Sequence, residues 1–475
     1  MDIKHVVVLM LENRSFDSML GMLYPSGTRF DGLTGTEQNT WHKLDGTGSE
    51  QISVWKAPDL TPLAACVPSP DPGELFTDIH MQIHGLTSAD GTLGISPTMN
   101  GFVDNYVRQP PTTSVYDPAA PMHYYTADQI PVLSQLARAF GVSDRWHAPA
   151  PCQTWPNRFF AHTGTANGFV NNSPTHFPYL METVFNRLAE DAKVPWRVYF
   201  HDVPQSITLT RLWGDVVSHF RPFNDDFIRD AHSGSLPAYS FIEPRYFADP
   251  ALRQMPNDQH PPHDVAYGES LIASVYNAVR NGPRWKNTLL VITYDEHGGC
   301  YDHVVPPAAT APGGPTPDGF DFGYFGVRVP AVVVSPWVPA GSIIRPRGLT
   351  PFDHTSIIAT LRKLFPFAPL TARDGAAPNL LDALTGDGSN DGPALINAPE
   401  PVAVSGEVAA AAAAKPNGMQ RALATAAVML PTAGADAATH VQRLAGVPDK
   451  APGHPTVAAA IADIVTHMKA FFGSL

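Results

Sequence analysis

The sequence has few cysteines and few charged residues. Its 475 residues include only three cysteines, too few for the disulfide framework of a small secreted domain, and the odd number leaves at least one thiol unpaired within the chain. Charged residues make up 16%, against roughly 25% in an average soluble protein. No apolar run approaches the roughly 20 residues that span a bilayer, so we predict no integral membrane insertion.

Basic residues are also outnumbered by acidic ones. Lys and Arg total 31 against 44 Asp and Glu, which gives a net charge of −13. Nucleic-acid-binding proteins normally carry a basic surface, so we predict no nucleic acid partner. Hydrophobic residues (44%) and proline (48 residues) are plentiful. This composition excludes general disorder and indicates a large, loop-rich, acidic globular protein, with the oligomeric state left open.

The N-terminal segment is apolar but short. Ile3–Leu11 has no cationic start and no small-residue cleavage site, and Glu12 ends it. We therefore interpret it as a buried strand rather than a signal peptide. A chain without a signal peptide is expected to be a soluble cytoplasmic protein, or a periplasmic or secreted one if a leader has been removed.

Short, fully apolar runs alternate with helical patterns along the chain. Val6–Leu11, Leu289–Tyr294 and Ala331–Val334 suit parallel strands that are covered on both faces. Between and after them, apolar residues recur at helical spacing. The segments with this spacing are Val132–Phe140, Asp264–Arg280 and Thr355–Leu364. The pattern predicts an α/β fold with a doubly wound, mostly parallel sheet flanked by helices.

Long tracts without clear periodicity interrupt this pattern. Residues 40–120, 201–260 and 306–325 predict loop insertions. We expect a catalytic domain over residues 1–400, followed over residues 401–475 by an Ala/Pro-rich linker and a helical tail. The polar face of the tail helix is not basic, which favours packing on the main domain over binding to a membrane or a partner.

Oxygen-rich residue pairs follow two of the predicted strands. Glu12 and Asn13 come after the first run, and Asp295 and Glu296 come after the second. Ligands of open α/β sheets bind at the carboxyl ends of the strands, where crowded carboxylates repel one another unless a cation or proton lies between them. Either pair alone could equally cap a helix. Together they predict a divalent metal site, with Mg²⁺, Ca²⁺ or Mn²⁺ favoured and Zn²⁺ possible because histidines lie nearby.

A candidate nucleophile lies in the segment Ser143–Thr165. Pro156 suits the first turn of a helix, which places Thr154 beside the free backbone N–H groups of a helix start. The same local pattern fits Thr154 as a simple N-cap. Cys152 is a competing nucleophile, although an isolated cysteine is more often buried and inert.

Histidines are numerous, with 19 in the chain. Any one of them is more often a structural residue, but as a set they could hold phosphate oxygens, donate a proton or bind metal. Those within distinct motifs include His80, His201, His260 and His263.

Several motifs, in matching order, resemble the bacterial phosphoesterase family of phospholipases C and acid phosphatases, a branch of the alkaline-phosphatase-like superfamily. The resemblance covers about residues 3–380. The segments that carry it are Lys4–Ser18 (KHVVVLMLENRSFDS), Thr154–Asn157 (TWPN), His260–Glu269 (HPPHDVAYGE), Trp285–His303 (WKNTLLVITYDEHGGCYDH) and Asp353–Ser356 (DHTS).

The resemblance implies a metal-dependent phosphoric ester hydrolase that acts on a phosphate ester or phospholipid through a phosphothreonine intermediate. The implied metal ligands are Glu12, Asn13, Thr154, Asp295 and Glu296, with Thr154 also the nucleophile. The implied phosphate-contacting residues are His80, His201 and His263. His260 competes with His263 for this role, and His263 is the expected proton donor to the leaving group.

Two alternative functions stay open. One is a sulfatase or phosphonate hydrolase on the same fold. A sulfatase would need a Cys or Ser that is oxidised to formylglycine, and Cys152 lies two residues from Thr154. The other is a non-catalytic protein that binds phosphorylated ligands. A turnover assay with a chromogenic phosphate ester distinguishes an enzyme from a binding protein.

Overall fold

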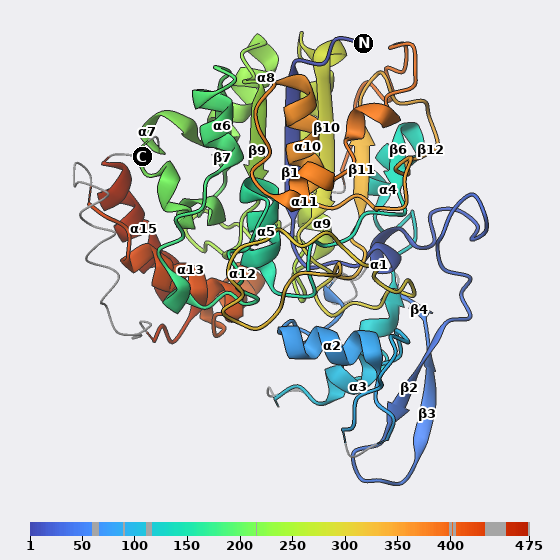
Figure 1. Ribbon diagram of the computed structural model, residues 1–475. Helices are drawn as coiled ribbons and strands as arrows, with labels where there is room; N and C mark the ends of the chain where they lie inside the picture. The colour runs from blue at the N-terminus through green and yellow to red at the C-terminus, as the bar shows by residue number, and fades with distance from the viewer. Residues whose placement is uncertain are drawn as a thin grey trace.

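The computed structural model describes residues 1–58, 66–88, 91–110, 116–214, 216–398, 401, 405–432 and 453–473. An eight-stranded sheet forms its centre (Figure 1), with the strand order β12-β6-β11-β10-β1-β9-β7-β8. The strands are β1 (His5–Leu11), β6 (Gly141–Ser143), β7 (Trp196–Phe200), β8 (Phe220–Pro222), β9 (Tyr239–Glu243), β10 (Thr288–Tyr294), β11 (Ala331–Val334) and β12 (Ser342–Ile343).

The sheet is mostly parallel, as predicted. β1 lies between β9 and β10 and is parallel to both. The exception is β11, which is antiparallel to both of its neighbours, so the prediction of Ala331–Val334 as a parallel strand is wrong. A parallel return needs a crossover connection, usually a helix. Residues 295–330 contain no helix, and the chain re-enters the sheet from the end at which it left.

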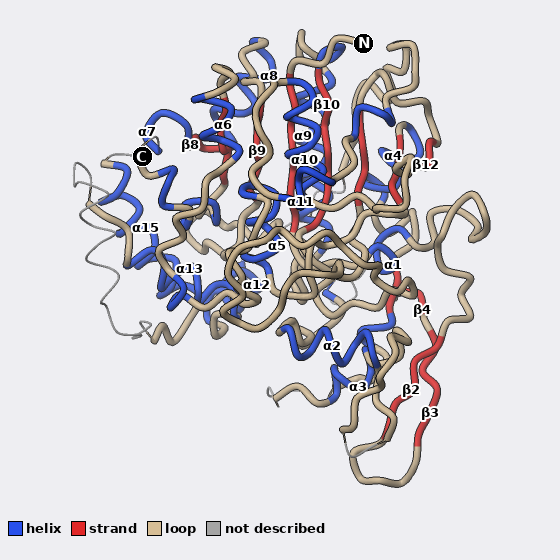
Figure 2. The backbone as a smooth tube through the Cα atoms, viewed as in Figure 1, coloured by secondary structure: helices blue, strands red, loops and turns tan. Residues whose placement is uncertain are grey.

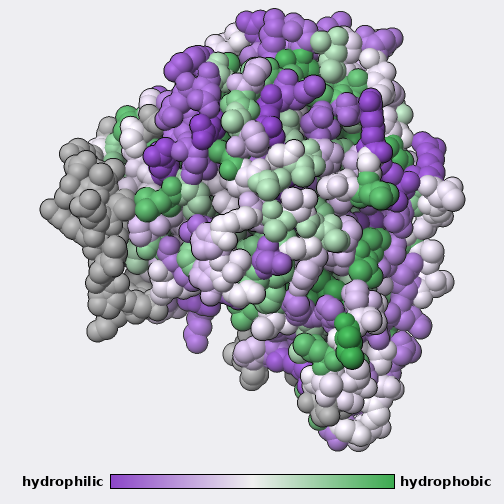
Figure 3. All heavy atoms as spheres, in the orientation of Figure 1, coloured by the Kyte–Doolittle hydropathy of each residue, from purple (hydrophilic) through white to green (hydrophobic). Residues whose placement is uncertain are grey.

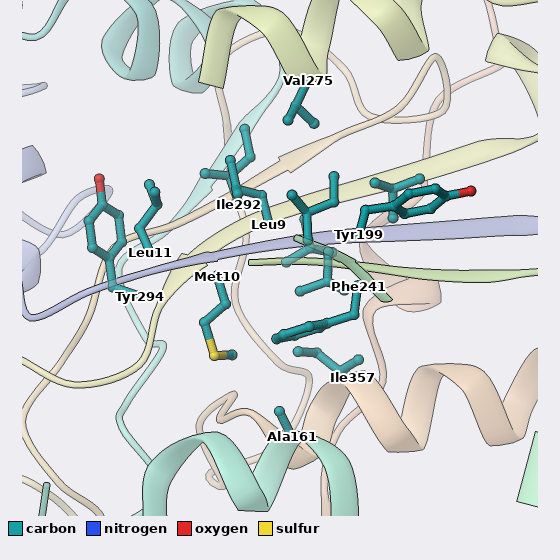
Figure 4. Packing of buried hydrophobic residues seen from close by; sticks show 14 of the residues in the cluster. Leu9, Met10, Leu11, Ala161, Tyr199, Phe241, Val275, Ile292, Tyr294 and Ile357 are labelled. Carbon is teal, nitrogen blue, oxygen red and sulfur yellow. The ribbon is translucent and has the colours of Figure 1, made fainter. Parts of the chain in front are cut away.

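Helices cover both faces of the sheet and confirm the three predicted helical segments. Figure 4 shows Leu9 and Ile292 pointing toward Val275 on one face, while Met10 points toward Ala161 on the other. Successive side chains of a strand alternate between faces, so β1 is apolar throughout because helices lie on both sides. The covering helices are α4 (Pro131–Ala139), α5 (Thr154–Thr163), α9 (Val265–Arg280) and α10 (Thr355–Leu364).

Two of the three tracts predicted as loop insertions contain regular structure. Residues 40–120 contribute a β-hairpin and two helices that extend below the sheet in Figure 1, and residues 201–260 contribute two strands of the sheet. Residues 306–325 contain neither helix nor strand. The elements of the first tract are β2 (Gln38–His42), β3 (Ser49–Ser53), β4 (Trp55–Lys56), α2 (Phe76–His84) and α3 (Phe102–Val107).

The remaining elements are short helices, one short strand and the C-terminal helices. They are α1 (Phe16–Leu20), β5 (His123–Tyr124), α6 (Val184–Glu190), α7 (Val216–His219), α8 (Ile228–Ser233), α11 (Ala372–Ala376), α12 (Ser405–Ala413), α13 (Gly418–Val428) and α15 (Val457–Phe472).

The last helix, α15, packs on the main body of the protein. The ring of Phe472 stacks 6.1 Å from that of Phe200 in β7, and the ring of Phe471 meets Trp213 at 5.9 Å. The apolar face of α15 is therefore buried against the sheet end and the loop after β7. The domain boundary at residue 400 stays a prediction.

Within the described ranges, every helix is too short or too polar to span a membrane. On the face shown in Figure 3, hydrophobic residues form small patches separated by hydrophilic ones.

Candidate active site

β1 and β10 place two polar pairs at one edge of the sheet. The last residues of the two strands pair in register, so Glu12-Asn13 and Asp295-Glu296 leave the sheet side by side, among the loops that Figure 2 shows below it. The backbone N–H of Asn13 donates to Oδ1 of Asp295 at 2.9 Å. All four residues are fully buried. The predicted meeting of these pairs is confirmed.

A glycine permits this close approach. Gly298 has a φ of +59°, and a Cβ at this position would lie 2.6 Å from Cβ of Asn13. A side chain is excluded both by the left-handed backbone and by the contact. Gly298 therefore lets the loop after β10 close directly over Asn13.

Helix α5 brings Thr154 to the same edge. The helix begins at Thr154 with Gln153 before it, so the interpretation of Thr154 as an N-cap is wrong. One turn later, Nη2 of Arg158 lies 2.7 Å from Oε1 of Glu12, and Nε donates to Oδ2 of Asp295 at 3.1 Å. Residues four apart share one face of a helix. The ion pairs of Arg158 therefore turn the Thr154 face of α5 toward the ends of β1 and β10.

Four buried oxygens of this site have no hydrogen-bond partner among the described residues. Buried polar atoms are nearly always paired, so an unpaired set within one site points to a missing ligand. Hard oxygen donors suit Mg²⁺, Ca²⁺ or Mn²⁺, and the set fits a divalent cation. The four atoms are Oε2 of Glu12, Oδ1 of Asn13, Oγ1 of Thr154 and Oε1 of Glu296.

The crowding of buried carboxylates also supports a divalent cation in this site. Burial raises the pKa of Glu12 well above its usual value, and the neighbouring Asp295 raises it further. Burial likewise raises the pKa of Glu296, with further contributions from Glu74 and Asp295. A cation among these carboxylates would relieve their mutual repulsion.

Asp295 differs from the other predicted ligands. Its Oδ1 accepts hydrogen bonds from the backbone N–H groups of Asn13 and Glu296, and its Oδ2 accepts from Arg158. Both oxygens are therefore engaged in holding the two strand ends and α5 together. A role of Asp295 as a metal ligand stays a prediction.

Sequence reasoning missed an acidic pair beside the site. Oε1 of Glu74 lies 2.7 Å from Nδ2 of Asn13 and 3.2 Å from Nε2 of His260. Asp71, Glu74 and His260 each offer a possible ligand atom within 4.8 Å of the others. Burial opposes protonation of His260, but Asp71 and Glu74 raise its pKa well above its usual value. No sequence pattern marks Asp71 and Glu74, because they lie in a proline-rich stretch before α2.

His263 is connected to the site through Asp258. Nδ1 of His263 donates to Oδ1 of Asp258 at 2.7 Å, and the backbone oxygen of Asp258 accepts from the N–H of Glu12 at 2.9 Å. Its ring centroid is 5.8 Å from that of His260. Both competing histidines therefore adjoin the site: His260 contacts Asn13, and His263 has a carboxylate partner. Asp258, two residues before His260, was also missed.

His80 and His201 have their contacts elsewhere. His80 hydrogen-bonds the hydroxyl of Tyr324 and lies against Phe76. His201 hydrogen-bonds the backbone oxygen of Glu243 at 3.1 Å, and burial lowers its pKa to about 3, so its ring is neutral. In the described part of the chain, no hydrogen bond or ion pair joins either histidine to the predicted metal ligands. Their phosphate-contacting roles stay predictions.

The competing nucleophile Cys152 is buried in an apolar cluster with Phe160 and Phe322. Burial raises the pKa of its thiol well above the usual value. Because the thiolate is the reactive form, Cys152 has the properties of an inert structural cysteine. The geometry favours Thr154.

Comparisons with known proteins agree with these features. A sequence profile of the phosphoesterase family matches residues 3–368. Non-specific phospholipase C1 of Arabidopsis thaliana is 38% identical over 393 residues, which cover 79% of this chain and 69% of that relative. Phospholipase C A of Mycobacterium tuberculosis is 28% identical over 437 residues, which cover 80% of this chain and 77% of that protein.

Among solved structures, similarity is found to the crystal structure of a protein in the alkaline phosphatase superfamily from Vibrio parahaemolyticus. The two chains are 11% identical, with a TM-score of 0.32 over 52% of this chain and 64% of the other. Similarity at this level carries no information on activity.

Proposed function

Since this chain belongs to the phosphoesterase family and is a phosphoric ester hydrolase, we propose that it releases the alcohol from a phospholipid or related phosphate ester, with Thr154 as the nucleophile. The relatives named as phospholipases C support this substrate class. The observation that carries the proposal is the buried, unpartnered Oγ1 of Thr154, which occurs together with three other unpartnered oxygens of the site.

We propose further that the site takes a divalent cation, with Mg²⁺, Ca²⁺ or Mn²⁺ favoured and Zn²⁺ possible. A bound cation supplies two effects here: it lowers the pKa of a ligating hydroxyl, and it offsets negative charge on the phosphate oxygens. The residues that would hold it are Glu12, Asn13, Thr154 and Glu296, with Asp295 as the fifth predicted ligand.

The reaction would proceed in two steps at phosphorus. In the first, Oγ1 of Thr154 releases its proton to solvent and forms a bond to phosphorus while the bond from phosphorus to the alcohol oxygen breaks. We propose that His263 gives that oxygen a proton from Nε2, a role supported by the hydrogen bond of its Nδ1 with Asp258. In the second step, the oxygen of a water molecule forms a bond to phosphorus while the bond from Oγ1 to phosphorus breaks. One proton of the water returns to His263, and Oγ1 of Thr154 takes up a proton from solvent.

A substrate panel tests this function. The protein, freed of metal and then loaded with one defined cation, is assayed with p-nitrophenyl phosphate, p-nitrophenylphosphorylcholine, phosphatidylcholine and p-nitrophenyl sulfate. We expect hydrolysis of phosphatidylcholine or p-nitrophenylphosphorylcholine, which stops with chelator and returns with the cation. Hydrolysis of the sulfate ester alone would favour a sulfatase. No hydrolysis by the loaded protein would mean that it only binds phosphorylated ligands.

A further inference from the structure

A cavity of about 260 Å³ lies beside His263, between the loop that precedes α9 and the C-terminal helices. In Figure 1, helices α12, α13 and α15 gather near the lower end of the sheet, the end at which β1 and β10 finish. The residues of the core that line the cavity include Cys66, Met255, Pro262 and His263, and those of the C-terminal helices include Ala411, Ala414 and Val457.

The walls of this cavity are largely apolar. Several of its polar side chains are already bonded within the protein: Nε2 of Gln420 donates to the backbone oxygen of Tyr246 at 2.8 Å, and Asp264 accepts from the N–H of Ala266 at 2.8 Å. They hold α13 and the start of α9 in place. Most of the other lining residues are Ala, Pro, Met and Val, and the polar ones among them are Cys66, His263, Lys415 and Asn417. Such a cavity favours an aliphatic ligand over a polar one.

The cavity adjoins the residue proposed to protonate the leaving group. His263 lines it and is bonded through Asp258 to the start of the predicted metal site. An alcohol oxygen that takes a proton from Nε2 of His263 would therefore have its carbon chain next to this cavity.

We infer that this cavity binds the aliphatic part of the alcohol that the enzyme releases, so that the C-terminal helices take part in substrate selection. The inference rests on the proposed function, and it adds that the apolar end of the substrate binds in this cavity. Each methylene that leaves water for such a site strengthens binding about fourfold. The rate at low substrate concentration should therefore rise with chain length until the cavity is filled.

The experiment compares monomeric phosphatidylcholines with two butyryl chains and with two hexanoyl chains, each below its critical micelle concentration. The measured quantity is the ratio of kcat/KM for the longer to the shorter lipid. The longer lipid has two more methylenes in each of its two chains. If one chain enters the cavity, its two extra methylenes predict a ratio of about fifteenfold in the native protein. Ala411→Trp and, independently, Ala414→Phe fill the cavity and should bring the ratio close to one. Ala410→Trp is the matched control, because Ala410 lies on the same helix, is exposed and does not line the cavity.

The possible outcomes separate the two proposals. Equal ratios in the native protein and both cavity variants would overturn the inference while leaving the hydrolase intact. Hydrolysis of p-nitrophenylphosphorylcholine without any hydrolysis of phosphatidylcholine would also overturn it. Failure of the native protein on every phosphate ester would refute the proposed function itself. A Tm that matches that of the native protein checks that each variant is folded.

Discussion

Oε1 of Glu74 accepts a hydrogen bond of 2.7 Å from Nδ2 of Asn13, so a carboxylate from the segment before α2 lies against the predicted metal site. The amide of Asn13 is thereby oriented: its nitrogen faces Glu74, and its oxygen is the atom without a partner among the described residues. Glu74 thus directs the Oδ1 of Asn13, and it also places a carboxylate beside the site proposed to bind an anionic substrate.

This charge predicts a gain of affinity in Glu74→Gln. The amide keeps the size of the side chain but removes the repulsion of the phosphate, because like charges brought together cost several kcal/mol. We expect the KM for p-nitrophenyl phosphate to fall by about tenfold. Glu50→Gln, at an exposed carboxylate of the β2–β3 hairpin, should leave it unchanged. A higher KM in Glu74→Gln would show instead that the orientation of Asn13 matters more than the charge.

Thr154→Ala is expected to abolish turnover. Loss of a covalent nucleophile lowers kcat by about four orders of magnitude or more, whereas Thr154→Ser keeps a hydroxyl and should retain part of the activity. Stopped-flow or steady-state assays with p-nitrophenylphosphorylcholine measure both. Phosphopeptide mapping after an acid quench provides an independent check on the native protein. An Ala variant with near-native kcat would exclude Thr154 as the nucleophile.

Glu12→Gln and Glu296→Gln are both expected to lose metal, and to change the stability of the metal-free protein in opposite directions. Each substitution removes one charge from carboxylates whose pKa values burial and mutual repulsion already raise. Elemental analysis should find lower metal content, and the rise in Tm on adding the cation should shrink. Without metal, Glu296→Gln should have a higher Tm than the native protein, whereas Glu12→Gln weakens the buried ion pair with Arg158 and should have a lower one. Full metal content in both variants would mean that these carboxylates are not ligands.

A separate ion cluster predicts how stability depends on pH. Nδ1 of His303 lies 2.6 Å from Asp17, and Nε2 lies 3.2 Å from Asp31. Burial lowers the pKa of His303, but the hydrogen bonds with these carboxylates outweigh it and raise the pKa to about 10. Arg328 pairs with Asp17 and with Asp302, each at 2.9 Å, so His303 and Arg328 together face three carboxylates.

The folded state therefore holds the His303 proton more tightly than the unfolded chain, whose histidine pKa is about 6.5. This contribution to stability is fully present below about pH 6.5 and is lost as the pH rises toward 10. Thermal unfolding should show a decline in Tm over this range that is smaller in His303→Asn. His232→Asn, at an exposed histidine, should follow the native protein. If the Tm declined equally with pH in all three proteins, His303 would not be the group responsible for the decline.

The elements with simple patterns could be predicted from the sequence, and those shaped by distant contacts could not. β1 and β10 are uninterrupted apolar runs because helices cover both their faces, and α9 shows a clear helical period. β9 (YSFIE) was not predicted from the sequence because Ser240 and Glu243 break its apolar run, although all five of its residues are buried. β11 was recognised as a strand, but its direction depends on the connection that precedes it.

The candidate active site also contains residues that a sequence pattern marks and residues that only the fold brings together. Four predicted metal ligands could be found because they form two pairs that directly follow strands. The pairs are Glu12 with Asn13 and Asp295 with Glu296. Arg158 could not, since its role arises only when α5 docks on the strand ends; its position four residues after Thr154 was the one available signal. Glu74 could not be found either, because it lies 61 positions from Asn13 in the sequence and contacts it only in the folded structure.

The central position of β1 also has a consequence for how the protein is made. Both strands that flank β1 come from the second half of the chain, beginning at Tyr239 and Thr288. At about 5–20 residues per second, the ribosome exposes the apolar segment Val6–Leu11 for roughly ten seconds or more before either partner emerges. Such a segment is prone to aggregation while unpaired. Production of this protein should therefore depend on chaperones that shield its N-terminus during synthesis, and yield should rise when they are supplied in excess.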